Sequence, residues 1–142
     1  MEYKIPLNLV ELEDGNYHLT ATCRFDDGTV GVWVIDTGAS KTVFDRTLTN
    51  LYQALPEHDD SRIHSAGIGA ARLETSLGLL LPFSFGSFIN CAMNVALIDL
   101  SHINKLYFHA TEKEICGLIG GDFLFANKAV IDYGSLTLTI KT

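Results

Sequence analysis

The stretch VIDTGAS, residues 34–40, places a carboxylate where it could act as an acid or a base. The apolar residues before Asp36 predict a strand that ends at this carboxylate. Gly38 then permits a sharp turn and a close approach of other backbone. The rest of the turn is small or hydroxylated, with Thr37, Ala39 and Ser40. An aspartate at such a place is often only a turn residue, so chemistry at Asp36 needs support from elsewhere in the chain.

A second stretch, VIDYGS at residues 130–135, nearly repeats the first. It also has an aliphatic pair, then an aspartate, one variable residue and a glycine. The repeat could reflect an old duplication, or only the frequency with which a strand, an aspartate and a turn follow one another. Asp132 is therefore a candidate for a second functional carboxylate.

The elements that must position these carboxylates are predicted to be mostly β-strands. Short apolar, β-branched runs alternate with Gly, Asp and Asn, which is typical of a closed barrel or a sandwich. Strands are expected at residues 3–10, 16–25, 29–35, 88–100, 115–119, 129–132 and 136–140, and a long hairpin at 63–81. A helix is expected at 101–110 with Ser101 as its N-cap, and one or two helical turns at 122–127.

Length and composition fit one folded domain over residues 1–142. The hydrophobic share of 47% argues against disorder, and the net charge of −7 without a basic run argues against nucleic-acid binding. No apolar run reaches the roughly 18 residues of a membrane span, and the first residues do not resemble a signal peptide. We therefore expect no membrane association and a cytoplasmic location. The widely spaced Cys23, Cys91 and Cys116 are expected to be buried, reduced thiols.

Two further motifs bring the sequence close to a known family. HSAGIGA, residues 64–70, bears two glycines, and GLIGGDFL, residues 117–124, has an apolar strand, two glycines and the expected start of a helix. With VIDTGA, they occur in the order and approximate spacing of the retropepsin-like aspartic peptidases, the single-domain relatives of pepsin. The closing KAVIDYGSLTLTI is similar to the C-terminal hairpin of bacterial members. The resemblance implies a mostly β, retropepsin-like barrel with one or two short helices.

The same resemblance implies an aspartic endopeptidase that acts on an extended peptide without a metal or a cofactor. Such hydrolysis needs a general base to activate water and a general acid to protonate the carbonyl oxygen and then the leaving amine. Two adjacent carboxylates can perform both roles, because charges so close cannot both be ionised and the pair shares one proton. This sharing is the established behaviour of aspartic-protease carboxylate pairs.

The chain contains one D-T-G, so the second carboxylate comes either from Asp132 or from a second copy of the chain. In the family, the Thr hydroxyls brace the two active-site loops against each other, and the bulky Tyr133 cannot repeat that role. VIDY also falls where the family has a core strand. The resemblance therefore implies a symmetric homodimer with two Asp36 carboxylates at its two-fold axis, and a structural role for Asp132.

The other roles implied by the resemblance follow position by position. Thr37 is expected to brace the loop, and Gly38 to accept a hydrogen bond from the approaching substrate backbone. Ala39 would line a pocket; pepsin-like members have Ser or Thr there, which favours the ionised carboxylate, so we expect a less acidic pH optimum than that of pepsin. Ser40 lies one residue too late for that bond. The flap tip would be Gly67, Ile68 and Gly69, and the hydrophobic–glycine loop Leu118, Ile119 and Gly120.

Some features do not follow the family pattern. Residues 101–114 exceed the compact viral form, and we expect either an added helix over the barrel or part of the dimer contact. The histidines lack the spacing of a metal site, and the group His58, Asp59, Asp60 and His64 is expected to be a solvated loop. An alternative function is a non-catalytic peptide-binding or dimerisation module, because a fold can outlast its chemistry.

Overall fold

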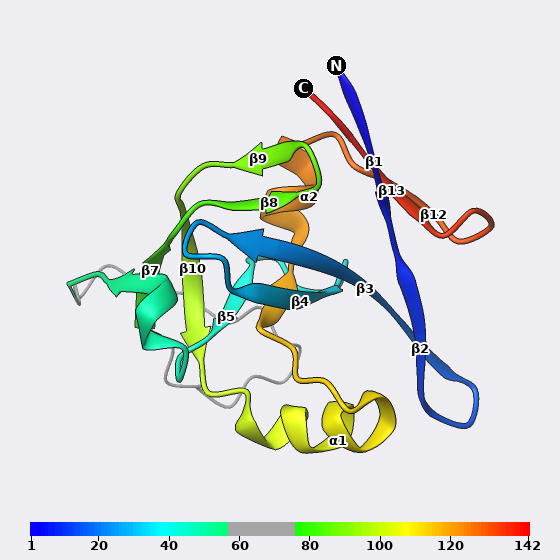
Figure 1. The fold of residues 1–142 in the computed structure, drawn as a ribbon, viewed down its shortest axis with the longest axis horizontal. Helices are drawn as coiled ribbons and strands as arrows, with labels where there is room; N and C mark the ends of the chain where they lie inside the picture. Colours follow the sequence, from blue (N-terminus) through cyan, green and yellow to red (C-terminus); the bar gives the residue numbers. More distant parts are fainter. Residues whose placement is uncertain (57–75) are drawn as a thin grey trace.

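The computed structural model describes residues 1–56 and 76–142 (Figure 1). Within these residues the chain is mostly β-strand, as the sequence predicted. The strands are β1 (Glu2–Pro6), β2 (Asn8–Glu13), β3 (Asn16–Phe25), β4 (Val30–Ile35), β5 (Val43–Asp45), β6 (Tyr52–Ala54), β7 (Ser76–Leu80), β8 (Phe83–Phe85), β9 (Phe88–Asn90), β10 (Met93–Ile98), β11 (Gly117–Ile119), β12 (Val130–Asp132) and β13 (Thr137–Lys141). The helices are η1 (Thr49–Leu51, a 3-10 turn), α1 (Ser101–Thr111) and α2 (Gly121–Ala126).

The described strands form two sheets. The larger runs in the order β6-β7-β10-β5-β11-β4-β3-β8-β9, with β2 paired to β3 beside this path. It curls into a half-barrel (Figure 1), which confirms the expected barrel-like, mostly β fold. The smaller sheet, in the order β1-β13-β12, brings the two ends of the chain side by side.

Strand β4 is apolar along its length, and beyond the exposed Val30 both of its faces are covered. The ring of Trp33 is fully buried in the main core, where it packs against Phe44 and its indole N–H donates a hydrogen bond to Sγ of Cys23 at 3.1 Å. The next residue, Val34, points to the opposite face and packs with Tyr107 of α1. Successive side chains of a strand alternate between faces, so β4 separates the barrel core from a smaller core beneath α1.

Strand β11 lies in the middle of the larger sheet and fixes the end of β4. It pairs in parallel with β4, so that Ile119 lies opposite Ile35, and antiparallel with β5 on its other side. Gly117, at the start of β11, has no room for a side chain. A Cβ atom there would lie 2.2 Å from the carbonyl oxygen of Val43 and 2.5 Å from the ring of Trp33. The close approach of these strands therefore requires glycine at this position.

The helix α1 confirms the expected position of a helix but not its cap. Leu100 occupies the N-cap position, and Ser101 is the first helical residue. Its N–H and hydroxyl both donate to Oδ1 of Asp99, so the Ser101 hydroxyl acts as a donor and does not cap the helix. Further along α1, the buried side chain of Asn104 accepts a hydrogen bond from the N–H of Ile115 and donates one to its carbonyl, at 2.7 and 3.0 Å. The helix is thereby tied to the chain that enters β11.

Several predicted boundaries differ from those observed. The strand expected at 3–10 is divided at Leu7 into β1 and β2, and that at 88–100 is divided into β9 and β10. Cys91 lies in the turn between them and is exposed, so its expected burial is wrong. Cys23 and Cys116 are buried and free, and burial raises the pKa of the Cys116 thiol. Neither α-helix in the described part of the chain is long and apolar enough to cross a membrane.

The packing at Gly117 gives a first prediction. We expect Gly117→Ala to lower the free energy of unfolding by about 3 kcal/mol, because the added methyl group must displace β5 backbone or the Trp33 ring. The measurement is urea denaturation followed by circular dichroism. Gly121→Ala is the matched control, since a Cβ there meets nothing closer than 3.6 Å and alanine favours the helix. Equal stability of the two variants would contradict the close-packed description of β11.

Candidate active site

Asp36 lies immediately after β4 and is held there by backbone hydrogen bonds. Its N–H donates to the carbonyl of Ile119 at 2.9 Å, which extends the β4–β11 pairing by one residue. Its Oδ1 accepts the N–H of Gly38 at 3.0 Å, and its carbonyl accepts the N–H of Ala39 at 3.2 Å. The side chain is half-buried. The carboxylate is therefore fixed in direction while one of its oxygens carries no hydrogen bond from the described residues.

The loop after Asp36 is docked onto the start of α2. The N–H of Gly121 donates to the carbonyl of Ala39 at 2.7 Å, and the N–H of Asp122 donates to that of Ser40 at 3.2 Å. A Cβ atom on Gly120 would lie 2.8 Å from the Ala39 oxygen, so glycine allows this contact. The two predicted groups, residues 36–40 and 118–120, are thus adjacent in the fold although they lie far apart in the chain. Thr42 and Asp122, which also meet here, are 80 residues apart.

Hydrogen bonds between Thr42 and Asp122 stabilise the contact between the Asp36 loop and the start of α2. Oδ1 of Asp122 accepts hydrogen bonds from the N–H and the hydroxyl of Thr42, at 2.9 and 2.7 Å. The Thr42 hydroxyl oxygen in turn accepts the N–H of Gly120 at 3.1 Å. Thr42 is fully buried, so each of these polar groups depends on the others for a partner. The sequence analysis did not identify this pair.

The Thr42 hydroxyl gives a second prediction. We expect Thr42→Val to destabilise the fold by about 1–3 kcal/mol, because the N–H of Gly120 and the Asp122 carboxylate each lose a buried partner. Thr47→Val is the control: it also removes a hydroxyl bonded to an aspartate, Asp45, but Thr47 is exposed and Asp45 keeps other donors. Urea denaturation of both variants measures the difference. A Thr42→Val protein as stable as the Thr47→Val protein would mean that the brace is unimportant.

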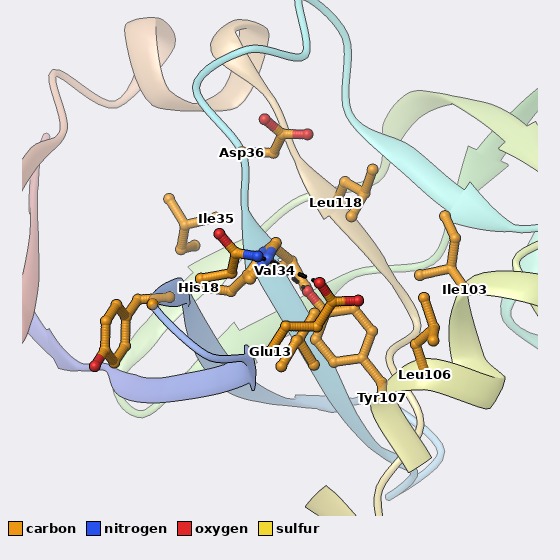
Figure 2. Close-up of a pocket in the computed structure, with 13 residues that line it drawn as sticks. Glu13, His18, Val34, Ile35, Asp36, Ile103, Leu106, Tyr107 and Leu118 are labelled. Atoms are coloured by element: carbon orange, nitrogen blue, oxygen red, sulfur yellow. Dashed lines mark hydrogen bonds between the residues drawn. The ribbon is translucent and has the colours of Figure 1, made fainter. Parts of the chain in front are cut away.

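A cavity of about 750 Å³, the Asp36 pocket, lies beside this carboxylate (Figure 2). Its apolar walls come from β2, β4, α1 and β11, with Leu12, Val34, Ile35, Ile103, Leu106 and Leu118. Its polar groups are Asp36 and, from the β2–β3 hairpin and α1, Glu13, Asn16, Tyr17, His18 and Tyr107. Figure 2 shows Asp36 at one end of the pocket and Glu13 toward the other. Its volume is within the usual range for sites that hold a small ligand or part of one, about 300–1,000 Å³.

Tyr107 and His18 form a polar pair in this pocket. The Tyr107 hydroxyl and Nδ1 of His18 are 3.1 Å apart, and their rings meet edge to face. Burial raises the pKa of Tyr107 to about 12, and the negative charge of the nearby Asp36 adds to the shift. The phenol therefore stays neutral at physiological pH and is a hydrogen-bonding wall rather than a charge.

The remaining predicted residues have different surroundings. Thr37 and Gly38 are exposed at the turn, and Ser40 is also exposed. Ala39 is half-buried, and its carbonyl accepts the N–H of Gly121. It was expected to line a pocket, but it is not among the residues that line the Asp36 pocket. The predicted flap residues Gly67, Ile68 and Gly69, and the loop group His58, Asp59, Asp60 and His64, lie outside the described residues. Among residues 1–56 and 76–142, no group of three or more His, Cys, Asp or Glu side chains is arranged to hold a metal ion.

Asp132 has the same local turn as Asp36 but a different position in the fold. Its Oδ1 accepts the N–H of Gly134 at 2.8 Å and that of Ser135 at 3.1 Å, and these bonds lower the pKa of the exposed Asp132 carboxyl, with Ser135 the larger cause. It lies at the end of β12, in the smaller sheet. The repeated sequence is explained by a shared turn in which an aspartate bonds to the residue two positions later.

No sequence motif marks the residues of α1 and the β2–β3 hairpin that line the Asp36 pocket. The one signal in the sequence was the extra segment 101–114. That segment is the helix α1, which packs against β2 and over the small core around Val34, as the first of its two expected positions required. Tyr107 and Glu13 have no motif of their own, so only the fold brings them to Asp36.

Comparison with known proteins shows which solved structures share this fold. No family model and no curated protein matches the chain. Among solved structures, a retropepsin-like aspartic protease from Rickettsia conorii matches with a TM-score of 0.51 and 16% identity, covering 99% of this chain and 90% of that chain. The retroviral protease-like domain of Ddi1 from Leishmania major matches with a TM-score of 0.53 and 15% identity, covering 87% of each. The chain therefore has the retropepsin-like fold, the fold of these aspartic proteases.

Proposed function

We propose that this protein is an aspartic endopeptidase whose active form is a homodimer with two Asp36 carboxylates at the two-fold axis. The observation that carries the proposal is the position of Asp36. Its carboxylate follows a central strand, is oriented by Gly38, and borders a pocket large enough for a substrate side chain. The retropepsin-like fold supports a protease-type function, and the intact Asp36, Thr37 and Gly38 supply its expected motif.

In this proposal, one Asp36 is ionised and its counterpart in the second chain is protonated. The ionised carboxylate takes a proton from water, and the resulting hydroxide attacks the carbonyl carbon of the peptide bond. The protonated carboxylate gives its proton to the carbonyl oxygen, which forms a neutral tetrahedral diol. As the diol collapses and the C–N bond breaks, the carboxyl group that took its proton from water gives it to the leaving nitrogen, and the other, now ionised, takes the proton of one diol hydroxyl. The products are a carboxylic acid and an amine, and the pair again holds one proton.

The surroundings of the described carboxylates support a second chain as the source of the partner carboxylate. Glu13 is the other carboxylate that lines the Asp36 pocket among the described residues, and it lies toward the opposite end (Figure 2). Asp132 is engaged by the backbone of its own turn in the smaller sheet. A symmetric pair of chains supplies two identical carboxylates from a single motif, since a two-fold interface brings the same residue from both sides.

Substitution of the two aspartates tests the catalytic role. We expect Asp36→Asn to reduce peptide cleavage at least about a thousandfold, because the amide can neither accept nor donate the required proton. Asp132→Asn should retain activity. The measurement is mass spectrometry of a mixed peptide library incubated with each protein across pH, where the optimum should be less acidic than that of pepsin. Loss of cleavage in a folded Asp132→Asn protein would instead favour a pair within one chain.

The oligomeric state tests the dimer separately. We expect sedimentation equilibrium to show association toward twice the 15.6 kDa of one chain, and cleavage per chain to rise with protein concentration over the same range. Mixing wild type with excess Asp36→Asn protein should suppress cleavage, because mixed dimers have one competent carboxylate. A strict monomer with constant activity per chain would contradict the mechanism. A dimer that cleaves nothing at any pH would favour the alternative, a non-catalytic peptide-binding or dimerisation module.

A further inference from the structure

We infer that the Asp36 pocket is a subsite that selects a basic side chain, arginine or lysine, beside the cleaved bond. The inference rests on the proposed function, because it assigns the pocket to a substrate that Asp36 acts on. It goes further in naming the chemistry of that substrate. The observations that carry it are the shape of the pocket, the signs of the charges that line it and the state of Glu13.

The walls of the pocket fit a long aliphatic stem. Val34 and Leu118 come from the two central strands beside Asp36, while Ile103 and Leu106 come from α1. An arginine or lysine side chain has three or four methylene groups, which such walls can cover while the charged end stays near polar groups. The pocket is open at its surface side through exposed residues of the β2–β3 hairpin, so the charged end remains partly hydrated.

The charges that line the pocket are negative. Asp36 and Glu13 are its carboxylates, and none of the described lining residues is lysine or arginine. The basic residues of α1, Lys105 and His109, line a different hollow together with Glu114. With a net charge of −7 on the whole chain, the pocket repels an acidic substrate side chain and attracts a basic one.

Glu13 is available to bind the basic group. Among the described residues, Lys141 forms an ion pair with Glu2, whereas Glu13 has no basic side-chain partner. Its Oε2 accepts a long contact of 3.5 Å from the side-chain amide of Asn16. A guanidinium or ammonium group from the substrate would therefore supply a charged partner that the described residues do not, and hydrogen bonds between charged groups are stronger than neutral ones.

Tyr107 and His18 complete the pocket without competing for this role. The Tyr107 hydroxyl and Nδ1 of His18 are paired with each other, and the phenol is neutral at physiological pH. A wholly apolar side chain would fill the walls but would form no charged hydrogen bond with Glu13, which lies exposed at the open side of the pocket. Such a side chain is therefore expected to bind less well than a basic one of equal length.

The first test measures cleavage of two synthetic peptides that differ only at the residue beside the cleaved bond, arginine in one and norleucine in the other. A peptide-library digest by the wild-type protein supplies the cleaved sequence. We expect kcat/KM to be about five- to tenfold higher for the arginine peptide, and Glu13→Gln to remove this preference by lowering the arginine value. Glu11→Gln is the matched control, since it removes the same charge from the same strand outside the pocket.

The outcomes separate the two proposals. Cleavage by wild type without a basic preference at either flanking position would overturn the subsite inference and leave the endopeptidase intact. Equal losses in Glu13→Gln and Glu11→Gln would also overturn it, because a general effect of net charge would then explain the preference. Absence of any cleavage would count against the proposed function, and the pocket is then tested by binding alone.

The binding test uses the Asp36→Asn protein, so that it does not depend on catalysis. We expect N-acetyl-arginine methylamide to shift the amide NMR signals of residues 13–18 and of Tyr107, and to do so at least about fivefold more tightly than N-acetyl-norleucine methylamide. The difference should disappear in the protein that also carries Glu13→Gln. Equal affinity for the two probes, or shifts confined to other parts of the chain, would overturn the inference.

Discussion

The pairing of β4 with β11 is the constraint on which the rest of the structure depends. It brings the end of one apolar strand beside another strand more than 80 residues away, and the last bond of this ladder, from Asp36 to Ile119, holds the candidate catalytic residue itself. Gly117 and Gly120 permit this close approach, and the hydrogen bonds of Thr42 with Asp122 and Gly120 stabilise it. Since a misplacement of about 1 Å can cost much of an enzyme's activity, we see the packing of β11 as part of the site rather than as its support.

The local turn at Asp36 is not what distinguishes it. In the described residues the same turn, with Oδ1 bonded to the N–H two residues later, occurs at Asp27, Asp36, Asp45, Asp99 and Asp132. At Asp45 it is buried against the start of α1, and at Asp132 it ends an exposed hairpin. Asp36 differs because its turn follows a central strand and borders a cavity. A common turn becomes a candidate active site through its position in the sheet.

The sequence was sufficient to predict the mostly β fold, the hairpin of β3 and β4, and the loop at Asp36, because strand periodicity and glycine-containing motifs are local signals. It also marked residues 118–120 as site residues, but only through the resemblance to a family, and the structure places them beside this loop. It could not reveal the brace between Thr42 and Asp122, since a pair so far apart in the chain leaves no local pattern. The same reason hides the contributions of Glu13 and Tyr107 to the pocket. Ser101 was wrongly assigned as the cap: it is the first helical residue, and its hydroxyl donates to Asp99.

The burial of Trp33 has a consequence for how the molecule can be observed. It is the single tryptophan of the chain, so all of the indole fluorescence comes from the strand that ends in Asp36. Its indole N–H is bonded to the Cys23 sulfur, and thiol groups in contact with an indole quench its emission. Weak, short-wavelength emission in the native state would therefore become brighter and shift to the red when this strand separates from its neighbours. The protein thus contains an intrinsic optical reporter three residues before Asp36.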